Sequence, residues 1–211
     1  MTSKSAPRDY TFIAPLYDHV FQSFLSEGHH DISEVIKSLK NKRGSKVLEV
    51  GVGSGLTLAH IPTTIEYTGI DINERMLKEA QKKQKRLGRR KINLVMMDAK
   101  KLTYKDSSFD LVVAASVITA VDSPLKVMRE MIRVTKKGGM IAIVANLQES
   151  NSLKSRMVRI FDPITRKYLG FRTDLDLAQL QKLRNIKLLN YKRTNNILGF
   201  PLSSFLLFEK T

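Results

Sequence analysis

The chain has 211 residues, a formal net charge of +16 and no cysteine, and 42% of its residues are hydrophobic. Its length and apolar fraction predict one folded domain, and the lack of cysteine excludes a disulfide scaffold, a thiolate metal site and a cysteine nucleophile, as is typical of a reducing compartment. The charge favours a polyanionic partner, either nucleic acid or an anionic membrane face.

The first part of the chain predicts two helices in front of a buried strand. Apolar residues at helical spacing predict a helix over residues 15–25, and a second helix is expected with Asp31 as its N-cap and Glu34 completing a capping box.

The longest apolar run, residues 111–121, is shorter than the roughly 20 residues of a membrane-spanning helix. The first residues lack the apolar core of a signal peptide, so a soluble cytosolic protein is expected.

Strands and helices alternate through the rest of the chain. One helix is expected after an Asn73 cap, and another from Pro124 to a stop at Gly138. Short apolar strands alternating with helices are typical of a parallel sheet covered on both faces. A basic tail with a helix between Asp162 and Gly170 leads to a hairpin whose turn lies at 199–201. The strands are expected at 46–50, 67–70, 93–97, 109–114, 140–144, 186–193 and 202–208.

A glycine triplet with acidic neighbours is the most informative pattern. Glycines at 51, 53 and 55 follow the first strand, where they lack a Cβ and tolerate positive φ. The third glycine comes one residue too early for the G-x-G-x-x-G of a dinucleotide loop, and Glu49 suits a cationic ligand better than a phosphate. Asp71 and Asp98 end the next two strands, where carboxylates can accept from a ribose diol and from an exocyclic amine. A tight turn would explain the glycines alone but not this set of acids.

Several stretches together resemble the class I S-adenosylmethionine-dependent methyltransferases in order and spacing: 49–55, 69–72, 97–99, 109–113 and 133–139. The resemblance implies a Rossmann-like α/β fold, with a mostly parallel seven-stranded sheet, a C-terminal antiparallel hairpin and helices on both faces. It implies a single domain over 1–211, in which 1–45 forms N-terminal lid and membrane-contacting helices. Residues 46–145 would form the cofactor-binding core, and 146–211 the basic acceptor-side segment and hairpin.

The resemblance also implies a cofactor, S-adenosylmethionine, which leaves as S-adenosylhomocysteine, and no metal. The glycines would approach the methionine and ribose portions, with Glu49 supporting their loop and Asp71 holding the ribose diol. Apolar side chains would pack on adenine, and Asp98 with Ala99 would read its amino edge. The cofactor-binding residues implied in this way are Tyr17, Glu49, Gly51, Gly53, Gly55, Asp71, Ile72, Met76, Asp98, Ala99 and Ala115.

Shorter pieces at 14–21, 113–121, 144–146 and 167–174 look like the small soluble bacterial phosphatidylethanolamine N-methyltransferases. This likeness implies stepwise methyl transfer to the lipid amine, towards phosphatidylcholine, by a protein peripherally bound to the inner face of the cell membrane. Tyr17 and His19 are the catalytic candidates for accepting the proton of the substrate ammonium. Tyr17 is preferred because its ring face also attracts a methylated cation.

Two basic stretches bear on the partner. Eight cations lie within 78–91 against Glu79, and a second stretch at 154–172 is opposed by Asp162. An anionic leaflet, at about 1 kcal/mol per charge, or RNA phosphates would satisfy them equally. Because no tryptophan or recognisable RNA-binding module is present, we expect a phospholipid substrate on an anionic membrane, no nucleic acid and no obligate protein partner. Two alternatives stay open: a class I methyltransferase acting on RNA or a soluble small molecule, and a non-catalytic basic binding module.

Overall fold

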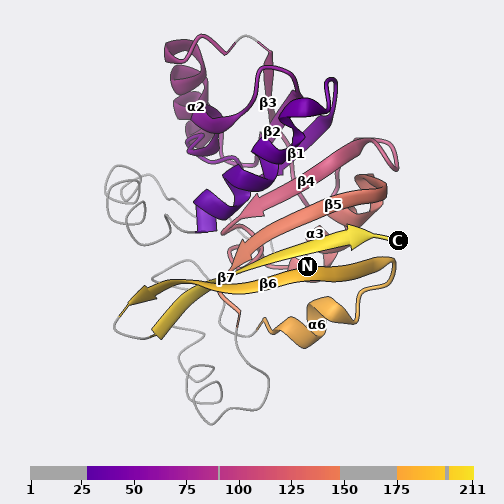
Figure 1. Ribbon diagram of the computed structural model, residues 1–211. Helices are drawn as coiled ribbons and strands as arrows, with labels where there is room; N and C mark the ends of the chain where they lie inside the picture. The colour runs from indigo at the N-terminus through magenta and orange to yellow at the C-terminus, as the bar shows by residue number, and fades with distance from the viewer. Residues whose placement is uncertain (1–27, 90, 148–174, 198–199) are drawn as a thin grey trace, which may run out of the picture.

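Seven strands form one twisted sheet in the computed structural model, which describes residues 28–89, 91–147, 175–197 and 200–211 (Figure 1). The strand order is β3-β2-β1-β4-β5-β7-β6, and all neighbours pair in parallel except for β7, which is antiparallel to β5 and β6. The expected mostly parallel sheet with a C-terminal hairpin is therefore confirmed. The strands are β1 Lys46–Val50, β2 Glu66–Asp71, β3 Ile92–Met96, β4 Phe109–Ala115, β5 Thr135–Ala145, β6 Ile186–Ile197 and β7 Phe200–Lys210.

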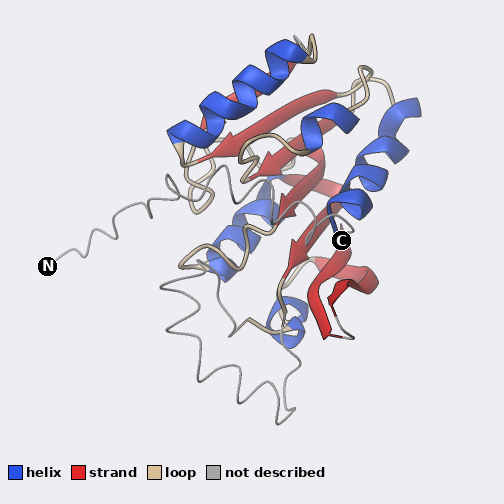
Figure 2. Cartoon of the chain, turned by 90° about the vertical axis from the view of Figure 1, so that its left-hand side faces the viewer, coloured by secondary structure: helices blue, strands red, loops and turns tan. Residues whose placement is uncertain are grey.

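Helices cover both faces of this sheet (Figure 2). One face packs against residues 28–38, the 3-10 turns η2 (Leu39–Asn41) and η3 (Thr57–His60), and α2 (Glu74–Arg86). The other face packs against α3 (Pro124–Val134) and α6 (Leu177–Gln181). Neighbouring residues of β1 show that both faces of the sheet are buried. Val47 packs in the apolar cluster on the face covered by α2, Leu48 packs in the cluster on the face covered by α3, and neither side chain is exposed.

The parallel strands give the sheet two unlike edges. All of β1 to β5 end at one side, here called the carboxyl edge, and begin at the other, the amino edge. In open α/β sheets ligands bind at the carboxyl edge. The β6–β7 hairpin extends past this edge, because β5 stops pairing with β7 at Ala145 and Ser204 while β6 and β7 continue pairing to Ile197 and Phe200 (Figure 1).

Three expectations about the elements need correction. Asp31 is not an N-cap, because the chain is already helical at residue 28, and the Asp31 carboxylate instead binds Lys192 Nζ at 3.1 Å. The helix from Pro124 ends at Val134 rather than near Gly138, because β5 begins at Thr135, which pairs with Phe109. The hairpin strands are longer than expected, and α6 was missed although Asp176 and Gln179 form a capping box.

Some expectations fall outside the described residues. The helix over 15–25, the basic stretch at 154–172 and the helix between Asp162 and Gly170 are among them. The expected hairpin turn is only partly covered, since 198–199 are not described while Phe200 and Pro201 belong to β7. Within the described ranges, no helix is both long and apolar enough to cross a bilayer.

Candidate functional site

The glycine loop after β1 is hydrogen-bonded to the end of β2. The backbone N–H groups of Gly51 and Val52 both donate to the Ile70 carbonyl, at 2.8 and 2.9 Å. The N–H of Gly53 donates to Asp71 Oδ2 at 2.9 Å. The loop conformation is thus fixed by the strand that carries the first acid of the expected site.

The three glycines are required for different reasons. All have positive φ, at 72°, 54° and 78° for Gly51, Gly53 and Gly55. A Cβ on Gly51 would come within 1.8 Å of the Val117 side chain, and one on Gly55 within 2.5 Å of Leu58. A Cβ on Gly53 would meet nothing within 4 Å. Gly53 is therefore where bare backbone faces open space, while the other two make room for packing.

Glu49 lies beneath the loop and is only 2% exposed. Its carboxylate accepts hydrogen bonds from the hydroxyls of Thr57, in η3, and Tyr67, in β2. Burial raises the pKa of Glu49 to about 7, against the two hydrogen bonds and with a further contribution from the nearby Asp71. Glu49 thus joins three elements behind the loop, in keeping with the supporting role expected for it.

Asp71 ends β2 beside the loop. Its Oδ1 accepts the Asn73 N–H at 2.9 Å, and its Oδ2 accepts that of Gly53. Burial raises the pKa of Asp71, and backbone N–H donors oppose that shift. Asn73 in turn caps α2, as expected, because its side chain accepts from the N–H groups of Arg75 and Met76.

Asp98 lies close along the same edge. The Met97 N–H donates to the Asp71 carbonyl at 3.0 Å, which brings the residues after β3 alongside the end of β2. Asp98 Oδ1 accepts the Lys100 N–H at 2.8 Å, and Lys100 Nζ lies 3.6 Å from Oδ2. The Asp98 side chain is 43% exposed, so it remains accessible to a ligand.

Apolar side chains lie at the rim beside these acids. Ile72 is 59% exposed and Met96, which pairs with Asp71 across β2 and β3, is 64% exposed. Large apolar side chains with that much exposure, next to a carboxylate, fit the flat face of a heterocycle. Met76 and Ala99 are half-buried, and Ala115, at the end of β4, is buried.

The structure brings together most of the expected site but not all of it. The residues from the ends of β1, β2 and β3 meet through the loop contacts above, whereas Tyr17 and His19 lie outside the described residues. Thr57, Tyr67 and Val117 also contribute to this site, but they are not among the site residues expected from the sequence. Their one signal is polar hydroxyls within apolar stretches for the first two, and a bulky residue after a strand end for Val117.

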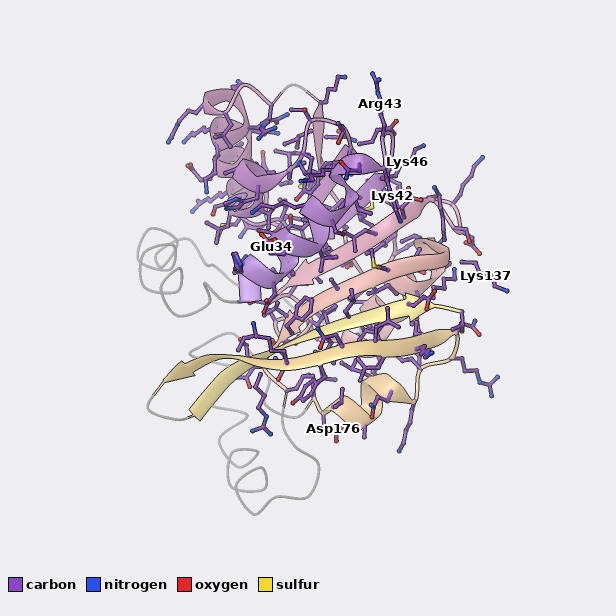
Figure 3. All side chains as sticks on the ribbon, in the orientation of Figure 1. Glu34, Lys42, Arg43, Lys46, Lys137 and Asp176 are labelled. Atoms are coloured by element: carbon purple, nitrogen blue, oxygen red, sulfur yellow. The ribbon has the colours of Figure 1, made fainter. Side chains whose placement is uncertain are left out.

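The basic end of α2 lies far from this site. The helix starts at the carboxyl edge, beside Asp71, and runs back towards the amino edge, where Lys85 and Arg86 lie. Lys42, Arg43, Lys46 and Lys137 extend from the same amino side, away from the strand arrowheads (Figure 3). The cations at the end of α2 therefore do not surround the glycine loop.

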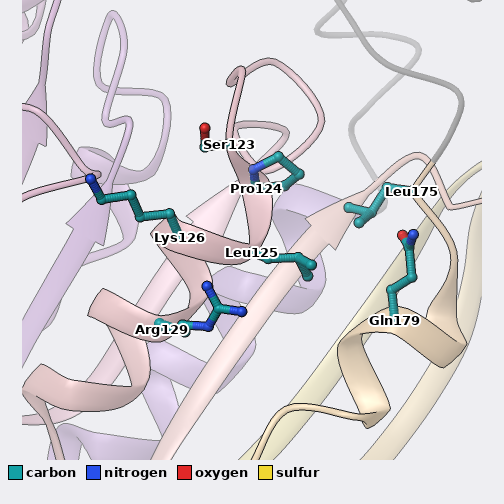
Figure 4. Close-up of a pocket in the computed structure, with 7 residues that line it drawn as sticks. All are labelled: Ser123, Pro124, Leu125, Lys126, Arg129, Leu175 and Gln179. Atoms are coloured by element: carbon teal, nitrogen blue, oxygen red, sulfur yellow. The ribbon is translucent and has the colours of Figure 1, made fainter.

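A separate open pocket lies between α3 and α6, with a volume of about 340 Å³ (Figure 4). Its lining includes Leu125, Arg129, Leu175 and Gln179. None of the expected cofactor-binding residues lines it. Within the described part of the chain, no group of three or more histidine or acidic residues is arranged to hold a metal ion.

Comparison with known proteins finds similarity to methyltransferases over the strands that form this edge. Residues 48–143 match the family described as "Methyltransferase domain". The chain is 43% identical over 105 residues to the phosphatidylethanolamine N-methyltransferase of Cereibacter sphaeroides, an overlap of 49% of this chain and 52% of the relative. It is 31% identical over 161 residues to the demethylmenaquinone methyltransferase of Staphylococcus aureus (strain JH9), covering 73% and 65%. The chain thus spans about half to two thirds of the length of these relatives.

Solved structures share the fold at low sequence identity. A SAM-dependent methyltransferase from Methanosarcina mazei superposes with a TM-score of 0.61 and 24% identity, over 80% of this chain and 93% of the other. The cyclase SpnF gives a TM-score of 0.63 and 17% identity, over 85% and 80%. At such identity the likeness establishes the architecture, and a fold shared with a cyclase does not by itself establish methyl transfer.

Proposed function

Because the chain contains a methyltransferase domain at residues 48–143, we propose that it uses S-adenosylmethionine to methylate the amine of phosphatidylethanolamine. The mono- and dimethylated products would be further substrates, leading to phosphatidylcholine. The observation that carries the acceptor is the 43% identity to a phosphatidylethanolamine N-methyltransferase, higher than the 31% to the quinone enzyme.

The residues at the carboxyl edge fit this cofactor. The open space beside Gly53 lets a ligand approach the backbone, and the lone pairs of Asp71 left by its two N–H donors can accept from ribose hydroxyls. Ile72 offers an exposed apolar surface to adenine, and Asp98 offers an acceptor for its amino group. When bound, the cofactor supplies an electrophilic methyl group on a sulfonium sulfur.

The protein's main contribution would be alignment of the acceptor. Methyl transfer needs the amine nitrogen, the methyl carbon and the sulfur in line and close together, and holding reactants in that geometry lowers the barrier. Ala115 and Ser116 lie where β4 ends, and the Ser116 N–H donates to the Val144 carbonyl at 2.8 Å, which fixes this floor of the edge. Tyr17 and His19 remain the proposed residues for taking up the ammonium proton.

The lipid surface is proposed to meet the carboxyl edge. There the β6–β7 hairpin extends beyond β5, and Ile72 and Met96 expose apolar surface. A protein that takes its acceptor from a bilayer must bring its cofactor edge to that bilayer. Peripheral attachment at the inner face of the cell membrane is part of this proposal.

Methylation of a quinone ring carbon is the second candidate. The demethylmenaquinone relative matches 73% of this chain, a longer overlap than the 49% of the phosphatidylethanolamine relative. An amine acceptor needs a proton acceptor for its ammonium, whereas a ring carbon of a quinol needs activation of a neighbouring hydroxyl. The two reactions give products that separate on a thin-layer plate.

The deciding experiment supplies both acceptors. The full chain is incubated with radiolabelled S-adenosylmethionine and liposomes that contain phosphatidylethanolamine, demethylmenaquinol or neither, and the chloroform phase is resolved by thin-layer chromatography. We expect label in mono-, di- and trimethylated phosphatidylethanolamine. Label in the quinol alone would select the second candidate, and label confined to the aqueous phase would reject both lipid acceptors. Tyr17→Phe should lower turnover more than it lowers the affinity for S-adenosylhomocysteine.

A further inference from the structure

Seven cations gather at the amino ends of β1 and β3 to form what we call the basic corner. They come from the segment that leads into β1 and the first residue of that strand, and from the end of α2 and its connection to β3. Gln84 Nε2 holds that connection against the sheet by donating to the carbonyls of Arg89, at 2.8 Å, and Ile92, at 2.7 Å. The members of the basic corner are Lys42, Arg43, Lys46, Lys85, Arg86, Arg89 and Lys91.

The positive charge of this corner is almost unopposed. Lys46 lies 3.8 Å from Glu66, but the other six members form no ion pair within the described residues. All seven except the half-buried Arg89 are exposed. Elsewhere on α2, Lys78 pairs with Glu74 and Lys82 with Glu79, while the exposed Arg75, at the opposite end of the helix, forms no ion pair within the described residues. A solvated face normally mixes signs in that way, and a cluster of seven cations with one ion pair departs from this pattern.

The corner also lies away from the cofactor edge. α2 has 13 residues and starts one turn from Asp71, so Arg86 lies about 20 Å along the helix from the carboxyl edge. One flat bilayer cannot touch both edges of the sheet at once. If the carboxyl edge faces the membrane, a step that rests on the proposed function, the basic corner faces away from it.

We infer that the basic corner binds the phosphate backbone of a nucleic acid without reading its sequence. Leu87, 40% exposed, is the one large apolar side chain exposed there among the described residues, whereas surfaces that insert into lipid present several. No aromatic side chain belongs to the corner, so contacts are made to phosphates rather than by base stacking. The proposal departs from the expectation, drawn from the sequence, that the chain has no nucleic-acid partner.

Binding of the full chain to a labelled 20-base-pair DNA duplex of arbitrary sequence tests the inference by fluorescence anisotropy. We expect the logarithm of the affinity to fall linearly with the logarithm of the salt concentration, because each neutralised phosphate contributes a slope of about −0.9. The variant Lys85→Glu/Arg86→Glu/Lys91→Glu should bind at least tenfold more weakly and with a shallower slope. A second duplex of unrelated sequence should bind equally.

A matched variant separates the corner from net charge. Lys101→Glu/Lys126→Glu/Arg129→Glu changes the net charge by the same amount at exposed positions outside the corner, and it should bind DNA within threefold of the parent. Equal losses in both variants, or none in the first, would overturn the inference. So would a corner variant that loses only its binding to phosphatidylglycerol vesicles. Lipid methylation is assayed separately, so loss of that activity would reject the proposed function and leave DNA binding untouched.

Discussion

Gly53 donates its backbone N–H to Asp71 Oδ2 at 2.9 Å, and this hydrogen bond links the glycine loop to the end of the neighbouring strand. The same carboxylate accepts the Asn73 N–H, next to the start of α2. Asp71 therefore shapes the loop, the helix start and the proposed ribose site together. A change at this position acts on the backbone as well as on the ligand.

Asp71→Asn should weaken the affinity for S-adenosylhomocysteine by ten- to one-hundredfold, measured by titration calorimetry. The amide keeps one acceptor oxygen but presents an NH₂ group to either the Gly53 N–H or the ribose, and a hydrogen bond to a charged group contributes about 1.5–3 kcal/mol. Glu79→Gln, an exposed acid on α2, is the control and should bind like the parent. Equal affinities for Asp71→Asn and the parent would exclude Asp71 from the site.

Alanine at Gly51 should mainly lower stability, whereas alanine at Gly53 should mainly weaken cofactor binding. Gly51→Ala should lower the free energy of unfolding by about 3 kcal/mol, because its Cβ clashes with Val117 at a positive φ. Gly53→Ala should cost about 1 kcal/mol of stability, since its Cβ meets open space, yet it should weaken cofactor binding. Denaturant titration and calorimetry measure the two quantities. Adding Val117→Ala should restore at least 1 kcal/mol to Gly51→Ala and nothing to Gly53→Ala.

The buried Glu49 carboxyl should make stability depend on pH. Its pKa rises on folding from 4.5 to about 7, so the folded state holds a proton that the unfolded state has lost between these values. This contribution is fully present below pH 4.5 and disappears as the pH rises through 7; it amounts to about 3 kcal/mol for the full shift. Glu49→Gln imitates the protonated form. Its stability relative to the parent should therefore increase from pH 5 to pH 8 in urea titrations, and a constant difference would contradict the assignment.

The sheet could be predicted from the sequence because its signals are local. Buried parallel strands such as β1 and β4 are short apolar runs, and Asn73 and Pro124 mark helix starts by their own chemistry. For the helix after Pro124 the sequence indicates an end near Gly138, because a glycine there is typical of a helix stop. The pairing of Thr135 with Phe109, a long-range contact, ends that helix first.

The site could be predicted only in part, because some of its features are local in the sequence and others depend on long-range contacts. The glycines and acids 49, 71 and 98 follow a linear spacing, so the sequence indicates them. Two other features depend on how the chain packs and how the strands pair. Position 51 must be glycine because Val117 occupies the space of a Cβ, and the Tyr67 hydroxyl reaches Glu49 because β1 and β2 are neighbours. The position of the positive charge is where sequence and structure differ most. The sequence shows a run of cations at 78–91, but it does not show that Lys85 and Arg86, at the end of α2, lie at the sheet edge opposite the glycine loop.

Substitution of the partly exposed Arg133 should lower the free energy of unfolding strongly, because its guanidinium joins α3 to the chain between β3 and β4. It donates to both carboxylate oxygens of Glu130, at 2.8 and 2.9 Å, and to the carbonyls of Leu102 and Tyr104, at 2.9 and 2.8 Å. Arg133→Lys keeps the charge but loses the planar fork, which matches such a set of acceptors. We expect a loss of about 2 kcal/mol in the free energy of unfolding.

The matched control for this position is Arg129→Lys, one turn earlier on α3, where the side chain is exposed and the change should stay within about 0.5 kcal/mol. Glu130→Gln in the Arg133→Lys background should add little, since the two side chains act as one unit. Because the segment that Arg133 holds follows Asp98, the affinity for S-adenosylhomocysteine should fall in Arg133→Lys and not in Arg129→Lys. Equal stability of the two lysine variants in denaturant titrations would show that the fork contributes nothing beyond its charge.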